Sequence, residues 1–138
     1  MAAVFLSAFV GRGWGGGYAV AAYALGGALL VVGLLLLGSA GVTLGSSLTP
    51  FPAPRPGRDV STSGAYALVR HPMYGGGILI ALGWTVIFAS IVGLGFTFLL
   101  VIFLDLKARR EEAWLVERLD DYAAYREQTP RKLVPFVY

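Results

Sequence analysis

Residues 75–104 read GGGILIALGWTVIFASIVGLGFTFLLVIFL, a run of thirty residues without a charged side chain. As a single helix this run would be roughly 45 Å long, whereas the hydrocarbon core of a bilayer is about 30 Å thick. Ser90, Gly93 and Gly95 mark a break near residues 89–93. We therefore expect a hairpin of two short helices, which returns the chain to the side of the membrane from which it entered.

Polar residues gather at both ends of this run. Residues 70–74, directly before it, read RHPMY and include the only histidine of the chain, and residues 109–112, shortly after it, read RREE. A single membrane-crossing helix would leave the two clusters on opposite sides of the bilayer, whereas a hairpin brings them together. Their convergence indicates an enzyme site built at a membrane surface.

The composition is typical of a membrane protein. Of 138 residues, 57% are hydrophobic and 14% are charged, whereas soluble domains carry about 25% charged residues. We interpret residues 1–138 as a single membrane-embedded domain. The absence of cysteine excludes disulfides, thiolate metal sites and cysteine nucleophiles. The net charge is +3, but the basic residues flank apolar runs instead of forming a patch on a soluble face, so we expect no nucleic-acid partner.

The expected fold is all-α and polytopic, with about three transmembrane helices. An uncharged run at residues 18–44 is the first span, residues 72–106 form the helical hairpin, and residues 107–138 form a C-terminal segment with an amphipathic helix over residues 116–128. Three Lys and Arg residues lie in the loop 45–71 and seven lie in the C-terminal segment. The positive-inside rule makes both cytoplasmic, in a protein of the inner cell membrane.

Proline and glycine mark two further features of the first half. Residues 49–58 contain four X-Pro steps and a glycine, which predicts an extended linker outside the hydrocarbon. Gly41 and Gly45 have the Gly-x-x-x-Gly spacing that lets membrane helices approach closely, and this spacing is compatible with a homodimer. Simple tolerance of glycine in membrane helices explains it equally well.

Arg70 and His71 stand at the expected start of a helix. Pro72 suits the first helical turn, because its missing N–H needs no partner there. Free backbone N–H groups at a helix N-terminus favour anions, and an adjacent arginine and histidine strengthen that preference. The pair could therefore hold a carboxylate or phosphate of a cofactor. The alternative is an interfacial cap, in which the arginine snorkels to the surface and the histidine caps the helix.

Three carboxylates follow the apolar run. Glu111 and Glu112 could hydrogen-bond a cationic or hydroxylated ligand, or could be solvated and paired with the arginines before them. Asp105 closes the run, and a carboxylate at a membrane edge is a functional candidate. Its alternative is an ion pair with Lys107 or Arg109.

Tyrosines supply the remaining candidate groups. Tyr66, Tyr122 and Tyr125 offer hydroxyls and ring faces, which can stabilise a cation. An interfacial aromatic belt explains the same residues without a ligand. With one histidine and no cysteine, we expect no metal-binding set.

Two motifs of the second half resemble those of a known family. Residues 61–66 read STSGAY and residues 70–76 read RHPMYGG, which resembles the T-x-G-x-Y…R-H-P-x-Y-x-G signature of integral-membrane methyltransferases. Residues 110–112, 122–126 and 129–135 resemble the glutamate pair, the Y-x-x-Y element and the P-R-L-x-P element in the tail of these enzymes. They are the isoprenylcysteine carboxyl methyltransferases and their bacterial relatives, with the phospholipid methyltransferases as distant relatives.

The resemblance implies S-adenosylmethionine-dependent methyl transfer to a lipophilic or small acceptor, with the active site at the cytoplasmic membrane face. By position, it implies that the cofactor is bound by Tyr66, Arg70, His71, Pro72, Met73, Tyr74, Gly76, Glu111 and Glu112. It also implies that Arg109, Arg110 and Glu112 are catalytic, with one of the two arginines facing the acceptor. Which glutamate binds the cofactor stays open. Arg58 is a positional match to a further pocket residue.

The implied chemistry suits these residues. Methyl transfer from a sulfonium needs no metal and no covalent enzyme intermediate, so alignment and desolvation can supply much of the catalysis. An acidic acceptor could be oriented by Arg109 or Arg110. An amine or thiol acceptor could need a base, for which His71 or a glutamate is available.

Two other functions compete with methyl transfer. Sterol-type membrane reductases carry a similar Arg-His-Pro-x-Tyr element and use NADPH, but the glutamate pair, the tyrosine-rich tail and the short chain argue against them. The second is a non-catalytic membrane scaffold, in which the motif residues only cap helices. Replacement of Arg70, His71 and Glu112 separates these functions, because an enzyme should lose cofactor binding while it stays folded.

Overall fold

The computed structural model describes residues 2–6, 11, 13–45, 62–119 and 121–135. The predicted proline-rich linker and Arg58 lie outside the described residues. Within these ranges the chain forms helices and no strand. The all-α fold class is therefore confirmed for this part of the chain.

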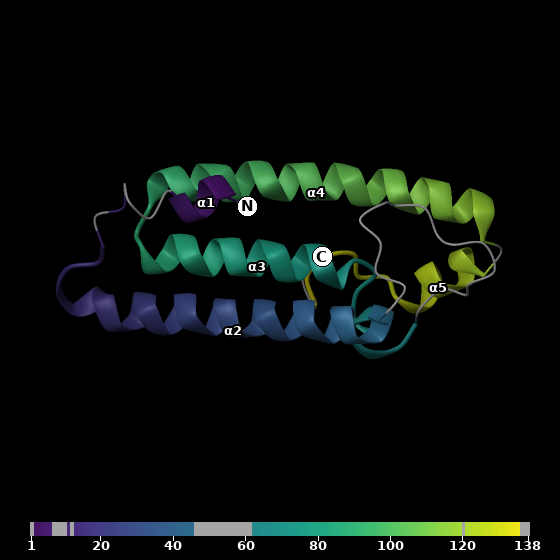
Figure 1. The fold of residues 1–138 in the computed structure, drawn as a ribbon, viewed down its shortest axis with the longest axis horizontal. Coiled ribbons are helices and arrows are strands. Elements are labelled where there is room, and N and C mark those ends of the chain that lie inside the picture. The colour runs from purple at the N-terminus through teal and green to yellow at the C-terminus, as the bar shows by residue number, and fades with distance from the viewer. Residues whose placement is uncertain (1, 7–10, 12, 46–61, 120, 136–138) are drawn as a thin grey trace.

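The helices lie roughly alongside one another in an elongated bundle (Figure 1). In chain order they are α1 (Ala2–Leu6), the 3-10 turn η2 (Gly16–Tyr18), α2 (Ala19–Leu44), the 3-10 turn η4 (Gly64–Ala67), α3 (Pro72–Ile87), α4 (Ile91–Arg118) and α5 (Tyr122–Gln128). The chain runs along α2, returns along α3 and turns again into α4, so the start of α3 and the end of α4 face the same end of the bundle (Figure 1).

Two helical segments are long and apolar enough to cross a membrane, Gly16–Leu44 and Ile91–Arg118. By length and composition, both are candidate membrane spans. The charged residues of α4 begin at Asp105, so its apolar part is Ile91–Leu104. Helix α3 has 16 residues, which makes it about 24 Å long. It is shorter than a hydrocarbon core, and the count of three spans stays a prediction.

Close approach of α2 and α3 depends on glycine. An added Cβ at Gly33 of α2 would lie 2.8 Å from the carbonyl oxygen of Gly76, and one at Gly83 of α3 would lie 2.6 Å from the carbonyl oxygen of Gly26. Small residues allow such contact between membrane helices, where dispersion forces hold the pair together. The pairing fixes how deep α3 sits beside α2, and hence where the start of α3 lies.

The chain turns between α3 and α4 at residues 88–90, which overlap the expected break at residues 89–93. Ala89 has a positive φ of 47°, and the hydroxyl of Ser90 accepts a hydrogen bond from the backbone N–H of Gly93 at 3.1 Å. This serine is therefore the N-cap of α4. Below the turn, the hydroxyl oxygens of Thr85 and Thr97 lie 3.2 Å apart and hold the two helices in register.

The C-terminal segment differs in detail from the expectation. Helix α4 continues to Arg118, and the short helix α5 begins at Tyr122, so the first residues of the expected helix 116–128 belong to α4. Residues 107–118 contain mainly Ala, Arg, Glu and Leu, which are strong helix formers and extend the membrane helix past its apolar part.

Candidate functional site

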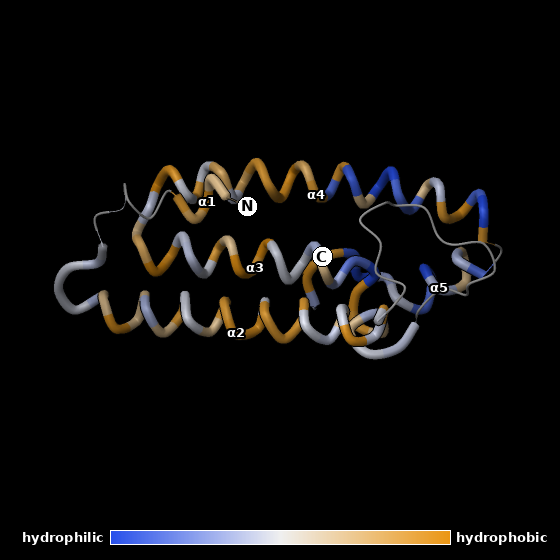
Figure 2. The backbone as a smooth tube through the Cα atoms, in the orientation of Figure 1, coloured by the Kyte–Doolittle hydropathy of each residue, from blue (hydrophilic) through white to orange (hydrophobic). Residues whose placement is uncertain are grey.

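Hydrophilic residues gather at the end of the bundle where α3 begins and α4 ends (Figure 2). The second half of α4, the start of α3, η4, α5 and residues 129–135 all meet there (Figure 1). Both motif clusters therefore lie at the same end, as the hairpin requires.

Glu112 joins the two clusters. Its Oε1 accepts from Nε of Arg70 at 2.8 Å and lies 3.1 Å from Nε2 of His71. The side chains of Arg70 and Glu112 are 8% and 9% exposed. A buried carboxylate in this position needs such partners, because an unpaired buried charge is strongly unfavourable. The start of α3 is thereby connected to the outer half of α4.

Arg70 and His71 also connect the site to the C-terminal segment. The backbone N–H groups of Arg70 and His71 donate to the carbonyls of Arg131 at 3.0 Å and Lys132 at 2.9 Å. The Arg70 guanidinium also donates to the carbonyls of Thr129 and Pro130, both at 2.7 Å. These four bonds hold residues 129–132 against the start of α3.

Glu111 binds a separate set of groups. Both of its carboxylate oxygens accept from the Tyr74 hydroxyl, at 2.7 and 2.8 Å. The ring of Tyr74 stacks on His71 at 5.3 Å between centroids. Lys107 lies 5.1 Å over the Tyr74 ring and 3.9 Å from Glu111. The two adjacent glutamates therefore have different hydrogen-bond partners. His71 lies near both, because its Nδ1 is 3.8 Å from Oε2 of Glu111 and its Nε2 is 3.1 Å from Oε1 of Glu112.

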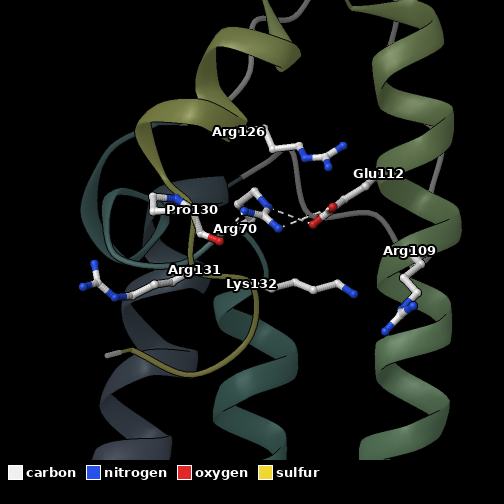
Figure 3. A pocket seen from close by; sticks show the side chains of 7 residues that line it. All are labelled: Arg70, Arg109, Glu112, Arg126, Pro130, Arg131 and Lys132. Carbon is white, nitrogen blue, oxygen red and sulfur yellow. Dashed lines mark hydrogen bonds and ion pairs between the residues drawn. The ribbon is translucent and has the colours of Figure 1, made fainter. Parts of the chain in front are cut away.

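A pocket of about 610 Å³ opens beside this cluster, between α4, α5 and the C-terminal segment (Figure 3). It is lined by Arg70, Arg109, Glu112, Arg126, Pro130, Arg131 and Lys132. Its volume lies in the range of small-molecule sites, about 300–1,000 Å³. Five of its seven lining residues are cationic and one is acidic, so its walls favour a ligand that carries negative charge.

Asp105 adds a second ion-pair cluster next to the pocket. Its carboxylate accepts from Nε of Arg109 at 2.7 Å and from Nζ of Lys132 at 2.6 Å. The expected pairing with Arg109 is thus present, and Lys132 is a partner that the sequence did not suggest.

Burial and charge oppose one another at Glu112, which lies two turns beyond the apolar part of α4. Burial by itself would raise its pKa, but the hydrogen bonds and positive charges of His71 and Arg70 outweigh burial. They lower the pKa of Glu112 from 4.5 to about 2. The carboxyl therefore stays ionised, and Arg70 keeps its acceptor, throughout the physiological range.

Burial acts in the same direction on the pKa values of the tyrosines, where the nearby positive charges do not outweigh it. It raises the pKa of Tyr66 to about 12, with a smaller contribution from the charge of Glu111. It also raises the pKa of Tyr125 to about 12 and that of Tyr122. These hydroxyls stay protonated, and that of Tyr125 donates to the backbone carbonyl of Tyr66 at 2.7 Å.

The lowered pKa predicts how Glu112 affects stability at different pH values. The unfolded carboxyl takes up a proton near pH 4.5 and the folded one near pH 2, so this contribution is complete above pH 4.5 and is lost as the pH falls toward about 2. Thermal unfolding of wild type and Glu112→Gln should give a constant difference in melting temperature from pH 7 to about pH 5, and a shrinking one below. A difference that widens in acid would contradict this assignment.

The structure separates the expected cofactor residues into two groups. Pro72 is fully buried, Met73 packs on the core cluster around Leu36, and Gly76 packs against Gly33. Arg70, His71 and Tyr74 lie around Glu111 and Glu112 and contact them by direct hydrogen bonds. Tyr66 packs on the same core cluster as Met73, and its backbone carbonyl accepts from Tyr125, whose ring lies beside Tyr122.

The expected catalytic residues are separated as well. Arg109 and Glu112 line the pocket, whereas Arg110 is exposed on α4 and does not line it. Sequence reasoning assigned no site role to Arg126, Pro130, Arg131 or Lys132, which form much of the wall. Arg126, Pro130 and Arg131 belong to elements that resemble the tail of the family, and residues 130–132 reach the site through their bonds with residues 70–71.

A metal site finds no support among the described residues, where no group of three or more His, Cys, Asp or Glu side chains could hold an ion. The donor set instead suits an organic ligand with charges of both signs. Carboxylates and tyrosine rings can face a cationic group, and the basic wall can face an anionic one.

Comparison with known proteins identifies the family of the chain. The family model described as phospholipid methyltransferase matches residues 20–121 of the chain. Protein-S-isoprenylcysteine O-methyltransferase of Schizosaccharomyces pombe is 37% identical over 105 residues, which make up 73% of this chain and 44% of that protein. The chain therefore spans less than half the length of this relative.

Proposed function

The chain belongs to the phospholipid methyltransferase family, and we propose that it catalyses S-adenosylmethionine-dependent methyl transfer to a lipophilic acceptor at the polar end of the bundle. The observation that carries this proposal is the joining of Arg70 and His71 to Glu112, beside a pocket of ligand size. The NADPH-dependent reductase and the scaffold are not favoured by the family match.

The residues of this end fit S-adenosylmethionine, which combines a sulfonium, an ammonium, a carboxylate and an aromatic base. Glu111 and Glu112 with the rings of Tyr66 and Tyr74 would hold its cationic groups, and Arg70 and His71 at the start of α3 would favour its carboxylate. When bound, the cofactor would supply a methyl group activated by the sulfonium.

The roles of the chain's own residues follow from their contacts. Glu112 fixes the positions of Arg70 and His71, and Arg70 in turn holds the C-terminal segment. A site assembled in this way is rigid, which favours alignment of donor and acceptor. Closure of the C-terminal segment over the start of α3 would also exclude water from the reacting groups.

The basic wall favours an acceptor with an acidic group. Arg109, Arg126 and Arg131 line the pocket, and guanidinium matches carboxylate or phosphate geometry. The relative from fission yeast is named for O-methylation of isoprenylcysteine. We therefore place an isoprenylated cysteine carboxylate first among the acceptors to test, and a phospholipid amine second.

The membrane arrangement is part of the proposal. We place α3 as a third, short span beside α2 and α4, and the polar end at the cytoplasmic face of the inner membrane. The basic residues concentrated in the C-terminal segment support this orientation. The exposed apolar side chains of α4, such as Leu99 and Phe103, would face lipid and allow a lipophilic acceptor to approach from the bilayer.

Calorimetric titration of the detergent-purified chain tests the cofactor. We expect saturable binding of S-adenosylmethionine and S-adenosylhomocysteine, and at least a tenfold weaker affinity in His71→Ala, because loss of one charge-assisted contact costs about 1.5–3 kcal/mol. Glu117→Gln, at an exposed position of α4, is the matched control and should bind like wild type. Binding of NADPH instead would establish the reductase, and binding of none by folded protein would favour the scaffold.

A further inference from the structure

Asp105 occupies an unusual position for a charged residue. It is the first charge after the thirty-residue apolar run, and its side chain is only 16% exposed. Both carboxylate oxygens are engaged, Oδ1 with Nζ of Lys132 at 2.6 Å and Oδ2 with Nε of Arg109 at 2.7 Å. Charges at membrane depth are retained when they are paired and have a role.

Contacts between the helices set the position of this cluster along the bundle. The Thr85–Thr97 contact sets α4 against α3, and Gly76 of α3 faces Gly33 and Leu37 of α2. Helix α2 continues for two further turns without a charged residue. Helix α3 lies between α2 and α4 (Figure 1), and the polar partners of Asp105 come from α4 itself and from the C-terminal segment.

Both the backbone and the side chain of Lys132 are held in place by hydrogen bonds. Its backbone carbonyl accepts from the N–H of His71 at 2.9 Å, and its side chain, 8% exposed, ends on Asp105. Lys132 and Arg109 both line the pocket (Figure 3). The carboxylate of Asp105 thus determines where two of the five cations in the pocket wall stand.

We propose that Asp105 is a positioning residue, which holds Lys132 and Arg109 so that their charges receive the anionic group of the methyl acceptor. The proposal rests on the proposed function for the identity of that ligand. It assigns to Asp105 no contact with the reacting atoms. Its removal should therefore weaken acceptor binding and leave the chemical step largely intact.

The chain offers a direct way to observe the position of Lys132, because it contains only two lysines, Lys107 and Lys132. Brief acylation of the full detergent-purified chain with acetic anhydride, read by peptide mass spectrometry, gives the reactivity of each. In wild type, the half-exposed Lys107 should react several-fold faster than the buried, ion-paired Lys132. In Asp105→Asn, Lys132 should react several-fold faster than in wild type, while Lys107 stays unchanged.

A kinetic measurement gives the second readout. With N-acetyl-S-farnesylcysteine as the acceptor, Asp105→Asn should raise KM about tenfold and change kcat less than about twofold, because an interaction used for binding has been lost. Asp105→Glu keeps the carboxylate and should restore most of the Lys132 protection and of the acceptor KM. Glu117→Gln removes an exposed carboxylate of the same helix and should behave as wild type.

Unchanged acylation of Lys132 in Asp105→Asn would overturn the proposal, and so would a lower kcat at unchanged KM. Failure of the proposed function would be visible separately, as absent S-adenosylmethionine binding in wild type. The acylation comparison would then decide alone whether Asp105 positions Lys132.

Discussion

Gly75→Ala is expected to abolish cofactor binding and to destabilise the chain, although it adds a single methyl group. A Cβ at this position would overlap the carbonyl oxygen of Leu133 and lie 2.9 Å from its carbonyl carbon. Neither atom belongs to a flexible side chain, so the C-terminal segment has to move away from α3. Such overpacking typically costs about 1–3 kcal/mol, and here it would also displace the carbonyls that hold Arg70 and His71.

Gly77→Ala is the matched control for this prediction. It lies two residues further along α3, and a Cβ there would meet no heavy atom within 4 Å. Alanine is also the better helix former by about 1 kcal/mol, so this variant should be as stable as wild type or slightly more so. Affinity for S-adenosylmethionine and thermal unfolding, measured on both variants, test the expectation. Equal binding by the Gly75 and Gly77 variants would show that the contact with Leu133 does not organise the site.

Glu112→Ala is the second substitution with a large expected effect. It leaves the buried guanidinium of Arg70 and the ring of His71 without their shared acceptor. Removal of one partner from a buried ion pair costs about 3–5 kcal/mol, and the free energy of unfolding should fall by about that amount. Cofactor binding should be lost with it.

A double-mutant cycle separates the ion pair from other effects at Glu112. Arg70→Ala and the double variant Arg70→Ala/Glu112→Ala should show strong coupling, because the two side chains share one short hydrogen bond at 2.8 Å. Glu117→Ala is the control, five residues further along α4, where the residue is exposed, and its effect should stay within about 0.5 kcal/mol. Additive effects of the Arg70 and Glu112 substitutions would contradict the central place given to this pair.

Much of the fold can be predicted from the distribution of charge. A run of thirty uncharged residues is too long for one span, and the small and polar residues near Ser90 mark its turn, which the structure places at residues 88–90. The end of α4 is harder to predict from the sequence than this turn. The sequence predicts a new helix from Val116, whereas α4 continues to Arg118, because sequence periodicity does not show where a membrane helix stops outside the bilayer.

The motif residues of the site can be predicted from the sequence, whereas most of the residues that line the pocket cannot. Arg70, His71 and Glu112 converge because a hairpin returns the chain, which follows from local sequence alone. The pairing of Asp105 with Lys132 depends on backbone bonds between residues 70–71 and the C-terminal segment. Such long-range pairing leaves no periodic pattern, so a lysine beside an arginine in the sequence gives no indication that its side chain is buried.

Transfer of tritium from S-adenosyl-[methyl-3H]methionine to N-acetyl-S-farnesylcysteine tests the central claim most directly. The account predicts that wild type and Glu117→Gln place the label in a base-labile methyl ester that partitions into organic solvent, and that Glu112→Ala does not. Folded wild-type protein that transfers no label to this acceptor or to phosphatidylethanolamine vesicles, and that binds no S-adenosylmethionine, would contradict it.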